Sequence, residues 1–243
     1  MSTLFLIATP IGNLEDVTDR ARRVLREVQV LACEDTRRTR ILLDHFGIPK
    51  PGVVLPCHEH NEQQVCGRLL ECLDRGENVA LCTNAGYPTV SDPGYLLTSR
   101  AIQAGHRIEV IPGPGAVEVA LLMSGLPVSS YTFKGFPPRK QGRRRTFLEM
   151  DRELPHTLVF FESPFRVGSF LADARDVLGD RMAAVCIELT KKFERVHRGY
   201  LGDLVPEFEA GPVKGEVTIV IAGNHPKFSR GAAEPAMAAP VGI

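Results

Sequence analysis

The stretch LFLIATPIGN, residues 4–13, decides the fold class of this chain. Residues 4–8 are apolar and predict a buried β-strand, and residues 9–13 break that strand with a proline and a glycine. The acidic and hydroxyl residues at positions 14–18 favour a helix start. Open α/β sheets bind ligands where a strand ends and turns toward a helix. The segment therefore predicts a ligand-binding loop in an α/β fold.

Strand-like and helix-like segments alternate through the first half of the chain. Helical apolar spacing followed by glycine marks the helices, and short apolar runs mark the strands. This alternation predicts a mainly parallel, five-stranded sheet with crossover helices. The expected strands are residues 4–8, 28–33, 53–56, 79–82 and 108–111, and the expected helices are residues 18–27, 37–46, 61–75 and 94–104.

The stretch PGPG at residues 112–115 interrupts the alternation of strands and helices, and the strand-like runs are spaced more widely beyond it. We therefore expect two α/β domains, an N-terminal one over residues 1–112 and a C-terminal one over residues 113–224. Residues 225–243 are rich in Ala, Pro and Gly without periodicity, which is typical of a disordered tail. Further strands are expected near residues 132–135, 157–161, 183–189 and 217–222.

Composition narrows the class of protein. The chain has 243 residues, 44% of them hydrophobic, and a formal net charge of zero, which suits a globular protein with proper cores. No apolar run approaches the roughly 20 residues of a membrane span, and residues 4–8 lack the basic flank of a signal peptide. We therefore expect a cytoplasmic protein with no membrane partner.

The cysteines suggest neither disulfides nor zinc. The six cysteines contain no C-x-x-C pair and lie mostly in apolar or helical contexts, which fits reduced thiols. Cys57, His58, His60 and Cys66 do not have the spacing of common zinc sites. No metal is expected.

The common phosphate-binding motifs are also missing. The chain has no G-x-x-x-x-G-K-[ST] motif, and no G-x-G-x-x-G follows the first strand, which disfavours kinases and NAD enzymes. Instead, Gly/Pro loops follow three predicted strands, at residues 9–13, 83–88 and 111–116. Small residues there let backbone groups approach a ligand closely, which suits a mostly uncharged adenosyl group. The alternative is that each loop is simply a tight turn.

Several motifs follow one another in an order that resembles a known family. They are TPIGNL at 9–14, EDTR at 34–37, HEHNE at 58–62, SDPG at 91–94, PGP at 112–114, GF at 135–136, GRR at 142–144, ESP at 162–164, ELTK at 188–191 and KGE at 214–216. As an ordered set over residues 4–223, they resemble the bacterial 16S rRNA (cytidine 2'-O-ribose) methyltransferases of the tetrapyrrole methylase superfamily.

The resemblance implies a fold, a cofactor and a substrate. The implied fold has two α/β domains with S-adenosylmethionine in the cleft between them. The implied activity is methylation of the ribose of a decoding-centre cytidine in 16S rRNA of the small ribosomal subunit, usually by a homodimer. Cofactor-binding residues are then expected at Pro10, Asn84, Ala85, Gly86, Tyr87, Gly115, Ala116, Glu162 and Glu216.

Carboxylates near the strand ends are the natural proton acceptors for such a transfer. Glu34 and Asp35 end the second predicted strand just before Arg37, so these three are the catalytic candidates, with Asp35 and Arg37 ranked first. Alternatively, Asp35 or the next residue, Thr36, caps a helix and the arginine is solvated. For Glu162, Glu188 and Lys191, which follow later strands, ordinary salt bridges are the competing explanation.

A basic run follows the stiff segment at residues 136–138. Its cations are expected to bind RNA phosphates from a loop, although a solvated helix face would have the same composition. They are Arg139, Lys140, Arg143, Arg144 and Arg145.

Three features depart from the family pattern. Residues 83–88 read TNAGYP where the family usually has S-D-A-G-T-P, so Asn84 lacks the charge of an aspartate. Phe165 stands where a histidine is frequent, and the sequence ends soon after residue 222 without the basic helical segment of many relatives, so RNA recognition is expected to rely on the core or a partner. Two alternatives therefore stay open: a non-catalytic RNA-binding relative, and a methyltransferase of the same superfamily acting on a tetrapyrrole.

Overall fold

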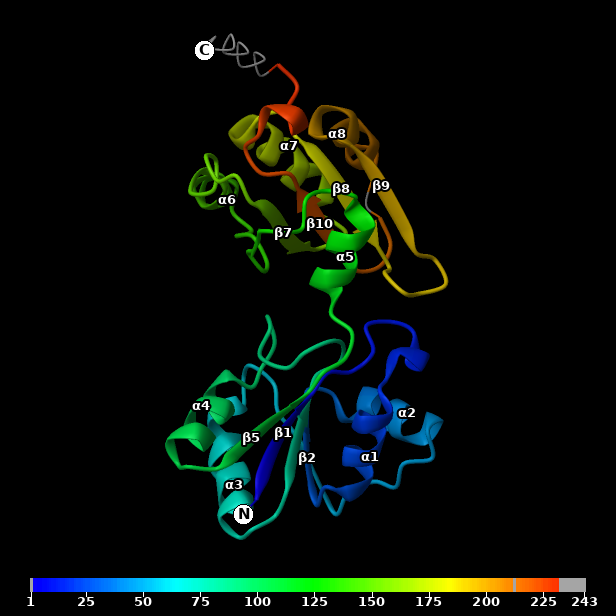
Figure 1. Ribbon diagram of the computed structural model, residues 1–243, viewed down its shortest axis with the longest axis vertical. Helices are drawn as coiled ribbons and strands as arrows, with labels where there is room; N and C mark the ends of the chain where they lie inside the picture. Colours follow the sequence, from blue (N-terminus) through cyan, green and yellow to red (C-terminus); the bar gives the residue numbers. More distant parts are fainter. Residues whose placement is uncertain (1, 212, 232–243) are drawn as a thin grey trace, which may run out of the picture. The chain divides into compact units, whose positions relative to one another are not determined.

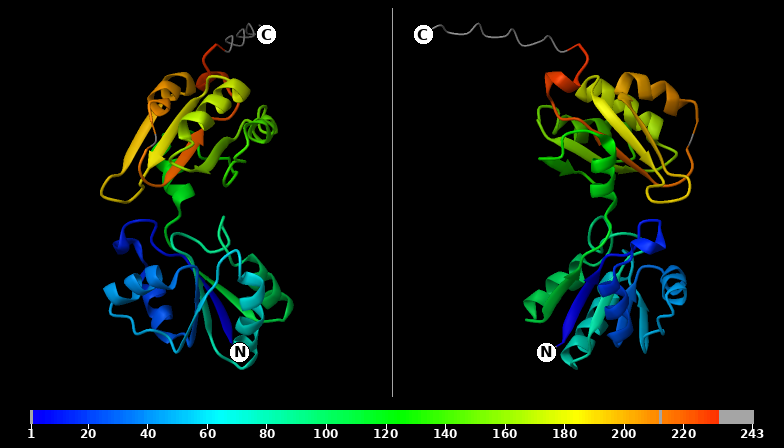
Figure 2. Two further views of the ribbon diagram at one scale, coloured as in Figure 1. Left: turned by 180° about the vertical axis from the view of Figure 1, so that it is seen from behind. Right: turned by 45° about the vertical axis from the view of Figure 1, so that its right-hand side comes forward.

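The computed structural model describes residues 2–211 and 213–231. Its contacts divide the chain into two units, Met1–Ala116 and Val117–Ile243. Each unit contains its own five-stranded sheet with helices packed on it (Figures 1 and 2). The first unit extends to Ala116 rather than ending at residue 112.

The first unit has the parallel sheet that the sequence predicts. The strand order is β3-β2-β4-β1-β5, and every neighbouring pair is parallel. The expected strands at residues 53–56 and 79–82 have the bounds that the structure gives them. The elements of this unit are β1 (Thr3–Ile7), η1 (Leu14–Asp16), α1 (Asp19–Glu27), β2 (Val30–Cys33), α2 (Thr36–His45), β3 (Val53–Pro56), α3 (Glu62–Asp74), β4 (Val79–Cys82), α4 (Tyr95–Gln103) and β5 (Arg107–Ile111).

Both faces of this sheet are covered, which explains why its central strands are apolar without alternation. Successive side chains of a strand point to opposite faces. Leu6 and Ala32 therefore pack with α3 and α4, whereas Ile7 and Cys33 pack with α1 and α2. Figure 1 shows the two pairs of helices on opposite sides of the sheet. This arrangement leaves the carboxyl ends of the strands and their loops as the natural ligand-binding edge.

The second unit has a mixed sheet in the order β6-β7-β10-β8-β9. Only the β6–β7 pair is parallel. The sequence predicts four of these strands and misses the exposed edge strand β9. The elements are α5 (Ala116–Ser124), β6 (Tyr131–Phe133), α6 (Gln141–Glu149), β7 (Thr157–Glu162), α7 (Val167–Leu178), β8 (Met182–Ile187), β9 (Arg195–Tyr200), α8 (Leu201–Glu209), β10 (Val217–Ile221) and η2 (Pro226–Phe228).

Three helices of the second unit share one core with the sheet. Side chains of α6, α7 and α8 pack against one face of β7, β8 and β10. Gly168 permits the close approach of α7 to α8, because a Cβ there would lie 2.6 Å from the carbonyl oxygen of Phe208. On the other face, Cys186 Sγ lies 3.9 Å from the carbonyl oxygen of Ala120 in α5.

The segment after β10 differs from the expected disordered tail. Residues 225–231 include η2, and Arg230 pairs with Asp203 at 2.5 Å. The backbone N–H of Arg230 also donates to the carbonyl of Asp180 at 2.8 Å. The prediction of disorder is therefore wrong for residues 225–231, and residues 232–243 lie outside the described residues.

The remaining expectations concern membranes, cysteines and metals. Within residues 2–211 and 213–231, no helix has the length and apolar character needed to cross a membrane. All six cysteines are free and buried, as expected for reduced thiols, and burial raises the pKa of Cys57 to about 11. In the same described part of the chain, no three His, Cys, Asp or Glu side chains are grouped as a metal site requires.

Candidate active site

The loops after β1 and β4 are joined by backbone hydrogen bonds. Thr9 and Gly86 each donate an N–H to the other's carbonyl at 2.9 Å. The Thr9 hydroxyl also donates to the carbonyl of Thr83 at 3.1 Å. Residues 9–13 and 83–88, which the sequence predicts as two walls of one site, therefore meet in the structure.

The loop after β5 is attached to the same pair. The Tyr87 hydroxyl donates to the carbonyl of Gly113 at 3.0 Å and accepts from the N–H of Gly113 at 3.1 Å. A Cβ at position 113 would lie 3.0 Å from the Ala8 Cβ and 3.3 Å from the Ala8 carbonyl oxygen. Glycine therefore lets the loop pass close to Ala8 without displacing it. Pro10, residues 84–87 and Gly115, expected to bind the cofactor, thus lie on three loops at one edge of the sheet, and Ala116 begins α5 directly after the third loop.

The side-chain oxygen of Asn84 is a hydrogen-bond acceptor that no described residue uses. Its backbone N–H donates to Glu34 Oε2 at 3.2 Å, so the loop after β2 supports the loop after β4. Asn84 Oδ1 is buried and has no hydrogen-bond partner among the described residues. A buried, unsatisfied amide oxygen is costly, and a ligand that donates to it removes that cost. Asn84 therefore presents one acceptor at the position where relatives usually have a carboxylate.

Asp35 is a helix cap rather than a free base. Its Oδ1 accepts from the backbone N–H of Arg37 at 2.8 Å, and its carboxylate binds the Arg37 side chain through Nε at 3.2 Å and Nη2 at 2.9 Å. These hydrogen bonds lower the pKa of Asp35 to about 2. So weak a base is poorly matched to proton abstraction near neutral pH. The structure thus shows the N-cap role of Asp35, and its lowered pKa makes it a weak proton acceptor.

Two family motifs that are far apart in sequence also meet in this unit. Glu62 Oε1, at the start of α3, accepts from the backbone N–H groups of Gly94 and Leu96 at 3.1 and 2.9 Å. The segment before them contains Thr89 and Ser91 with φ of 72° and 62°, in the left-handed region. Such backbone persists only where its surroundings hold it. Glu62, which ends the HEHNE motif but is given no role from the sequence, holds this segment at the start of α4.

In the second unit, Glu162 ends β7 and is buried. Its Oε1 accepts from the N–H of Ser163 at 2.6 Å and pairs with Arg166 at 2.5 Å. Glu162 Oε2 has no hydrogen-bond partner among the described residues. The predicted salt bridge is present, and one carboxylate oxygen is available to a ligand.

Glu188, Lys191 and Glu216 form an ion-pair group at the ends of β8 and β10. Lys191 Nζ lies 2.8 Å from Glu188 Oε1 and 3.0 Å from Glu216 Oε2. Burial acts to raise the pKa of Glu188, but hydrogen bonds from Lys191 and the Glu216 backbone lower it overall. Gly215 is required beside this group, because a Cβ there would lie 2.3 Å from the Glu188 side chain. Glu188 and Lys191 therefore form the ordinary salt bridge that is the alternative explanation for them.

The basic run divides into structural and exposed residues. Arg144 is buried and donates to Asp173 through Nε at 2.8 Å, and Arg145 binds the same carboxylate at 2.7 Å. Residues 141–145 open helix α6, so the expectation of a loop is wrong for them. A buried arginine cannot contact RNA phosphates, so Arg144 is not an RNA-binding residue. Arg139, Lys140, Arg143 and Arg145 are exposed, although Arg145 also pairs with Asp173.

The architecture and the three linked loops define an α/β class of protein with a ligand site at the carboxyl edge of a parallel sheet. Residues 3–205 match the family model of the tetrapyrrole (corrin/porphyrin) methylases. The chain therefore belongs to the tetrapyrrole methylase family, which confirms the family expected from its motifs.

Several proteins with similar sequences are named ribosomal RNA small subunit methyltransferase I. The protein of that name from Halalkalibacterium halodurans is 44% identical, over 93% of this chain and 77% of its own length. The one from Pseudomonas aeruginosa is also 44% identical, over 91% of this chain and 79% of its own. The one from Thermotoga maritima is 40% identical, over 92% of this chain and 100% of its own.

Solved structures share the fold at lower identity. A crystal structure of diphthine synthase superposes with a TM-score of 0.69 at 17% identity, covering 91% of this chain and 90% of that one. The uroporphyrin-III-C-methyltransferase of Thermus thermophilus superposes with a TM-score of 0.62 at 20% identity, covering 90% and 94% of the two chains. At such identities the similarity shows the fold and not the substrate.

Proposed function

We propose that this chain is an S-adenosylmethionine-dependent rRNA methyltransferase that methylates the ribose 2'-hydroxyl of a decoding-centre cytidine in 16S rRNA. The observation that carries the proposal is the 40–44% identity, over more than nine-tenths of this chain, to proteins named ribosomal RNA small subunit methyltransferase I. Such a substrate places the activity in the cytoplasm. The resemblance further implies a homodimer, which we include in the proposal.

The residues of the first unit fit S-adenosylmethionine, the methyl donor of this family. The cofactor carries donors, in its adenine amino, ribose hydroxyl and ammonium groups, that suit an unsatisfied acceptor such as Asn84 Oδ1. Gly113, which has no side chain, lies close to Ala8 at this edge and leaves its backbone open to a ligand. Glu162 Oε2, also without a partner among the described residues, is a further acceptor in the second unit.

When bound, the cofactor supplies a methyl group that is already activated by its sulfonium. The protein then has to orient the ribose hydroxyl, exclude water and accept the hydroxyl proton. Asp35 is unsuited to that last task because its pKa is lowered to about 2. We assign proton acceptance to Glu34, whose carboxylate lies against the Asn84 backbone at the same edge.

Exposed cations provide the contacts to RNA in this proposal. The Arg37 side chain is 89% exposed although it pairs with Asp35, so its remaining N–H groups can bind a phosphate. Arg139, Lys140 and Arg143 are exposed on the second unit. Their contribution to binding is electrostatic, so it weakens as the salt concentration rises.

The experiment is to incubate the protein with S-adenosylmethionine carrying a labelled methyl group and with small ribosomal subunits from cells that lack this modification. Label in 16S rRNA supports the proposal. Cofactor binding without label on RNA would favour the non-catalytic RNA-binding relative. Label on an added porphyrin precursor, with none on RNA, would favour a tetrapyrrole substrate.

A further inference from the structure

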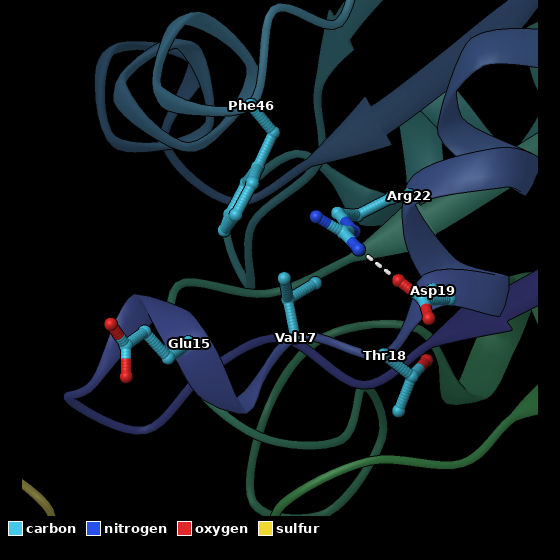
Figure 3. A pocket seen from close by; sticks show the side chains of 6 residues that line it. All are labelled: Glu15, Val17, Thr18, Asp19, Arg22 and Phe46. Atoms are coloured by element: carbon cyan, nitrogen blue, oxygen red, sulfur yellow. Dashed lines mark hydrogen bonds and ion pairs between the residues drawn. The ribbon is translucent and has the colours of Figure 1, made fainter.

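A pocket of about 450 Å³ lies beside the first loop of the proposed site, on the side of α1 and α2. Figure 3 shows the six side chains around it: Glu15, Val17, Thr18, Asp19, Arg22 and Phe46. Its volume is within the range of about 300–1,000 Å³ that is usual for small-molecule sites. None of these six residues takes part in the proposed methyl transfer.

Phe46 gives the pocket a fixed aromatic wall. It follows α2 directly, its ring is half-buried, and Arg26 Nη2 donates to its backbone carbonyl at 3.1 Å. The guanidinium carbon of Arg22 lies 5.3 Å from the ring centroid, and Arg22 also pairs with Asp19. The ring and the guanidinium are both planar, and the bond from Arg26 holds the backbone of Phe46, so together they suit a flat, aromatic ligand group.

The charged side chains that line the pocket determine which kind of flat group it can bind. Glu15 and Asp19 are exposed carboxylates, which only accept hydrogen bonds and which repel a phosphate. A carboxylate pairs well with an exocyclic amino group, as in recognition of the cytosine N4 amino group. Uracil offers no such amino group. The combination therefore favours an amino-bearing nucleobase over a phosphate or a uracil.

The pocket directly continues the proposed cofactor loop. Asn13, the last residue of the loop after β1, caps η1 by accepting from the backbone N–H of Glu15 at 3.1 Å. Glu15 and Val17 then line the pocket. The residues that would bind a nucleotide here therefore follow, within a few positions along the chain, the loop that we propose binds the cofactor.

We propose that this pocket binds a cytosine of the RNA substrate other than the methylated one, by stacking on Phe46 and by donation of its N4 amino group to Glu15 or Asp19. The proposal rests on the proposed function for its choice of RNA as ligand. In it, the pocket fixes the register of the RNA so that the correct ribose reaches the site.

Kinetics with small subunits test the role of the ring. Phe46→Leu removes stacking but keeps an apolar side chain, and we expect the KM for subunits to rise roughly tenfold, since the base loses its stacking contact with the aromatic ring. The kcat and the affinity for S-adenosylmethionine should not change. Phe46→Tyr should restore the wild-type KM.

A matched control is available in the second unit. Phe228 is half-buried beside a cation, with Lys227 Nζ 5.5 Å from its ring centroid, as Phe46 is beside Arg22. Phe228→Leu should leave the KM at the wild-type value. An equal rise in KM in both leucine variants, or an unchanged KM in Phe46→Leu with normal thermal unfolding, would overturn the proposal.

Photo-crosslinking separates this proposal from the proposed function. The full chain is irradiated with a 16S rRNA decoding-region fragment in which cytidines are replaced by 5-iodocytidine, and the crosslinked peptide is mapped. We expect a crosslink to Phe46, and a lower yield with 5-iodouridine at the same position. Methylation of subunits without any Phe46 crosslink would overturn the pocket and leave the function standing, whereas a Phe46 crosslink without methyl transfer would do the reverse.

Discussion

The Tyr87 hydroxyl forms two hydrogen bonds with the backbone of Gly113, one to its carbonyl at 3.0 Å and one from its N–H at 3.1 Å. Tyr87 stands where relatives of this family usually have threonine. Its longer side chain joins the loop after β4 to the loop after β5. The departure from the family pattern therefore adds a contact between two walls of the proposed cofactor site.

Tyr87→Phe tests this contact. It removes both hydrogen bonds but keeps the ring, so we expect the free energy of unfolding to fall by about 1–2 kcal/mol and cofactor binding to weaken several-fold. Isothermal titration with S-adenosylmethionine and chemical unfolding measure the two effects. Tyr95→Phe, whose side chain is 76% exposed in the same unit, is the control. Wild-type affinity in Tyr87→Phe would show that the link does not shape the site.

Asn84→Asp tests the other departure from the family. The change restores a carboxylate, and hydrogen bonds to a charged acceptor are roughly twice as strong as neutral ones. We expect S-adenosylmethionine to bind about three- to ten-fold more tightly, and Asn84→Ala to bind it more weakly than the wild type. Repulsion from Glu34, which contacts the Asn84 backbone, opposes the gain. Equal cofactor affinity in all three proteins would exclude Asn84 from the binding site.

Glu34 and Asp35 are adjacent carboxylates with different expected roles. Glu34→Gln keeps an acceptor for the Asn84 N–H but cannot take a proton, so we expect kcat to fall about 100-fold or more with little change in cofactor affinity. Asp35→Asn keeps a helix cap and should retain kcat within a few-fold. Single-turnover methylation of small subunits measures both. A large loss in Asp35→Asn alone would return the proton-acceptor role to Asp35.

The lowered pKa of Asp35 also predicts how stability depends on pH. The pKa is about 2 in the folded protein, against a reference value of 3.8. A carboxylate with a lowered folded-state pKa stabilises the fold above its unfolded pKa and loses that contribution as pH falls through the folded value. Asp35→Asn should therefore be less stable than the wild type at pH 7, and the difference should shrink between about pH 4 and pH 2. Urea unfolding across this range checks it; a constant difference would contradict it.

Arg143 and Arg144 are neighbours whose replacement should have opposite consequences. Arg144 pairs with Asp173 where both side chains are buried, 5% and 1% exposed, and Asp173 keeps Arg145 as a partner, so Arg144→Ala should lower the free energy of unfolding by about 1.5–3 kcal/mol. Arg143 is exposed, so Arg143→Ala should leave unfolding unchanged, weaken rRNA binding and reduce its salt dependence. Binding measured at several salt concentrations tests this. Unchanged RNA affinity in Arg143→Ala would show that α6 is not part of the RNA-binding surface.

The sequence predicts the helices and strands of the first unit well because short-range sequence patterns determine where they begin and end. Buried strands such as β4 are short apolar runs, and the helices around them end at glycines such as Gly76 and Gly105, both with positive φ. In the second unit these signals are weaker. β9 is a half-exposed edge strand with the sequence RVHRGY, which has no apolar alternation to reveal it.

The site depends on contacts that sequence patterns do not contain. The partners Tyr87 and Gly113 are 26 residues apart, and Arg144 and Asp173 are 29 residues apart. Asp35 illustrates the same difficulty at short range, because a carboxylate before an arginine suits a catalytic site and a helix cap equally well. The cap is identified only in the structure, by the bond from the backbone N–H of Arg37 to Asp35 Oδ1.

The most direct test of the proposed function is the chemical position of the transferred methyl group. Unmodified small subunits are incubated with the protein and S-adenosylmethionine, their 16S rRNA is digested to nucleosides, and the methylated nucleoside is identified and mapped by mass spectrometry. We predict 2'-O-methylcytidine at a single decoding-centre position. A methyl group on a base, on another nucleotide or absent from the rRNA would contradict the proposal.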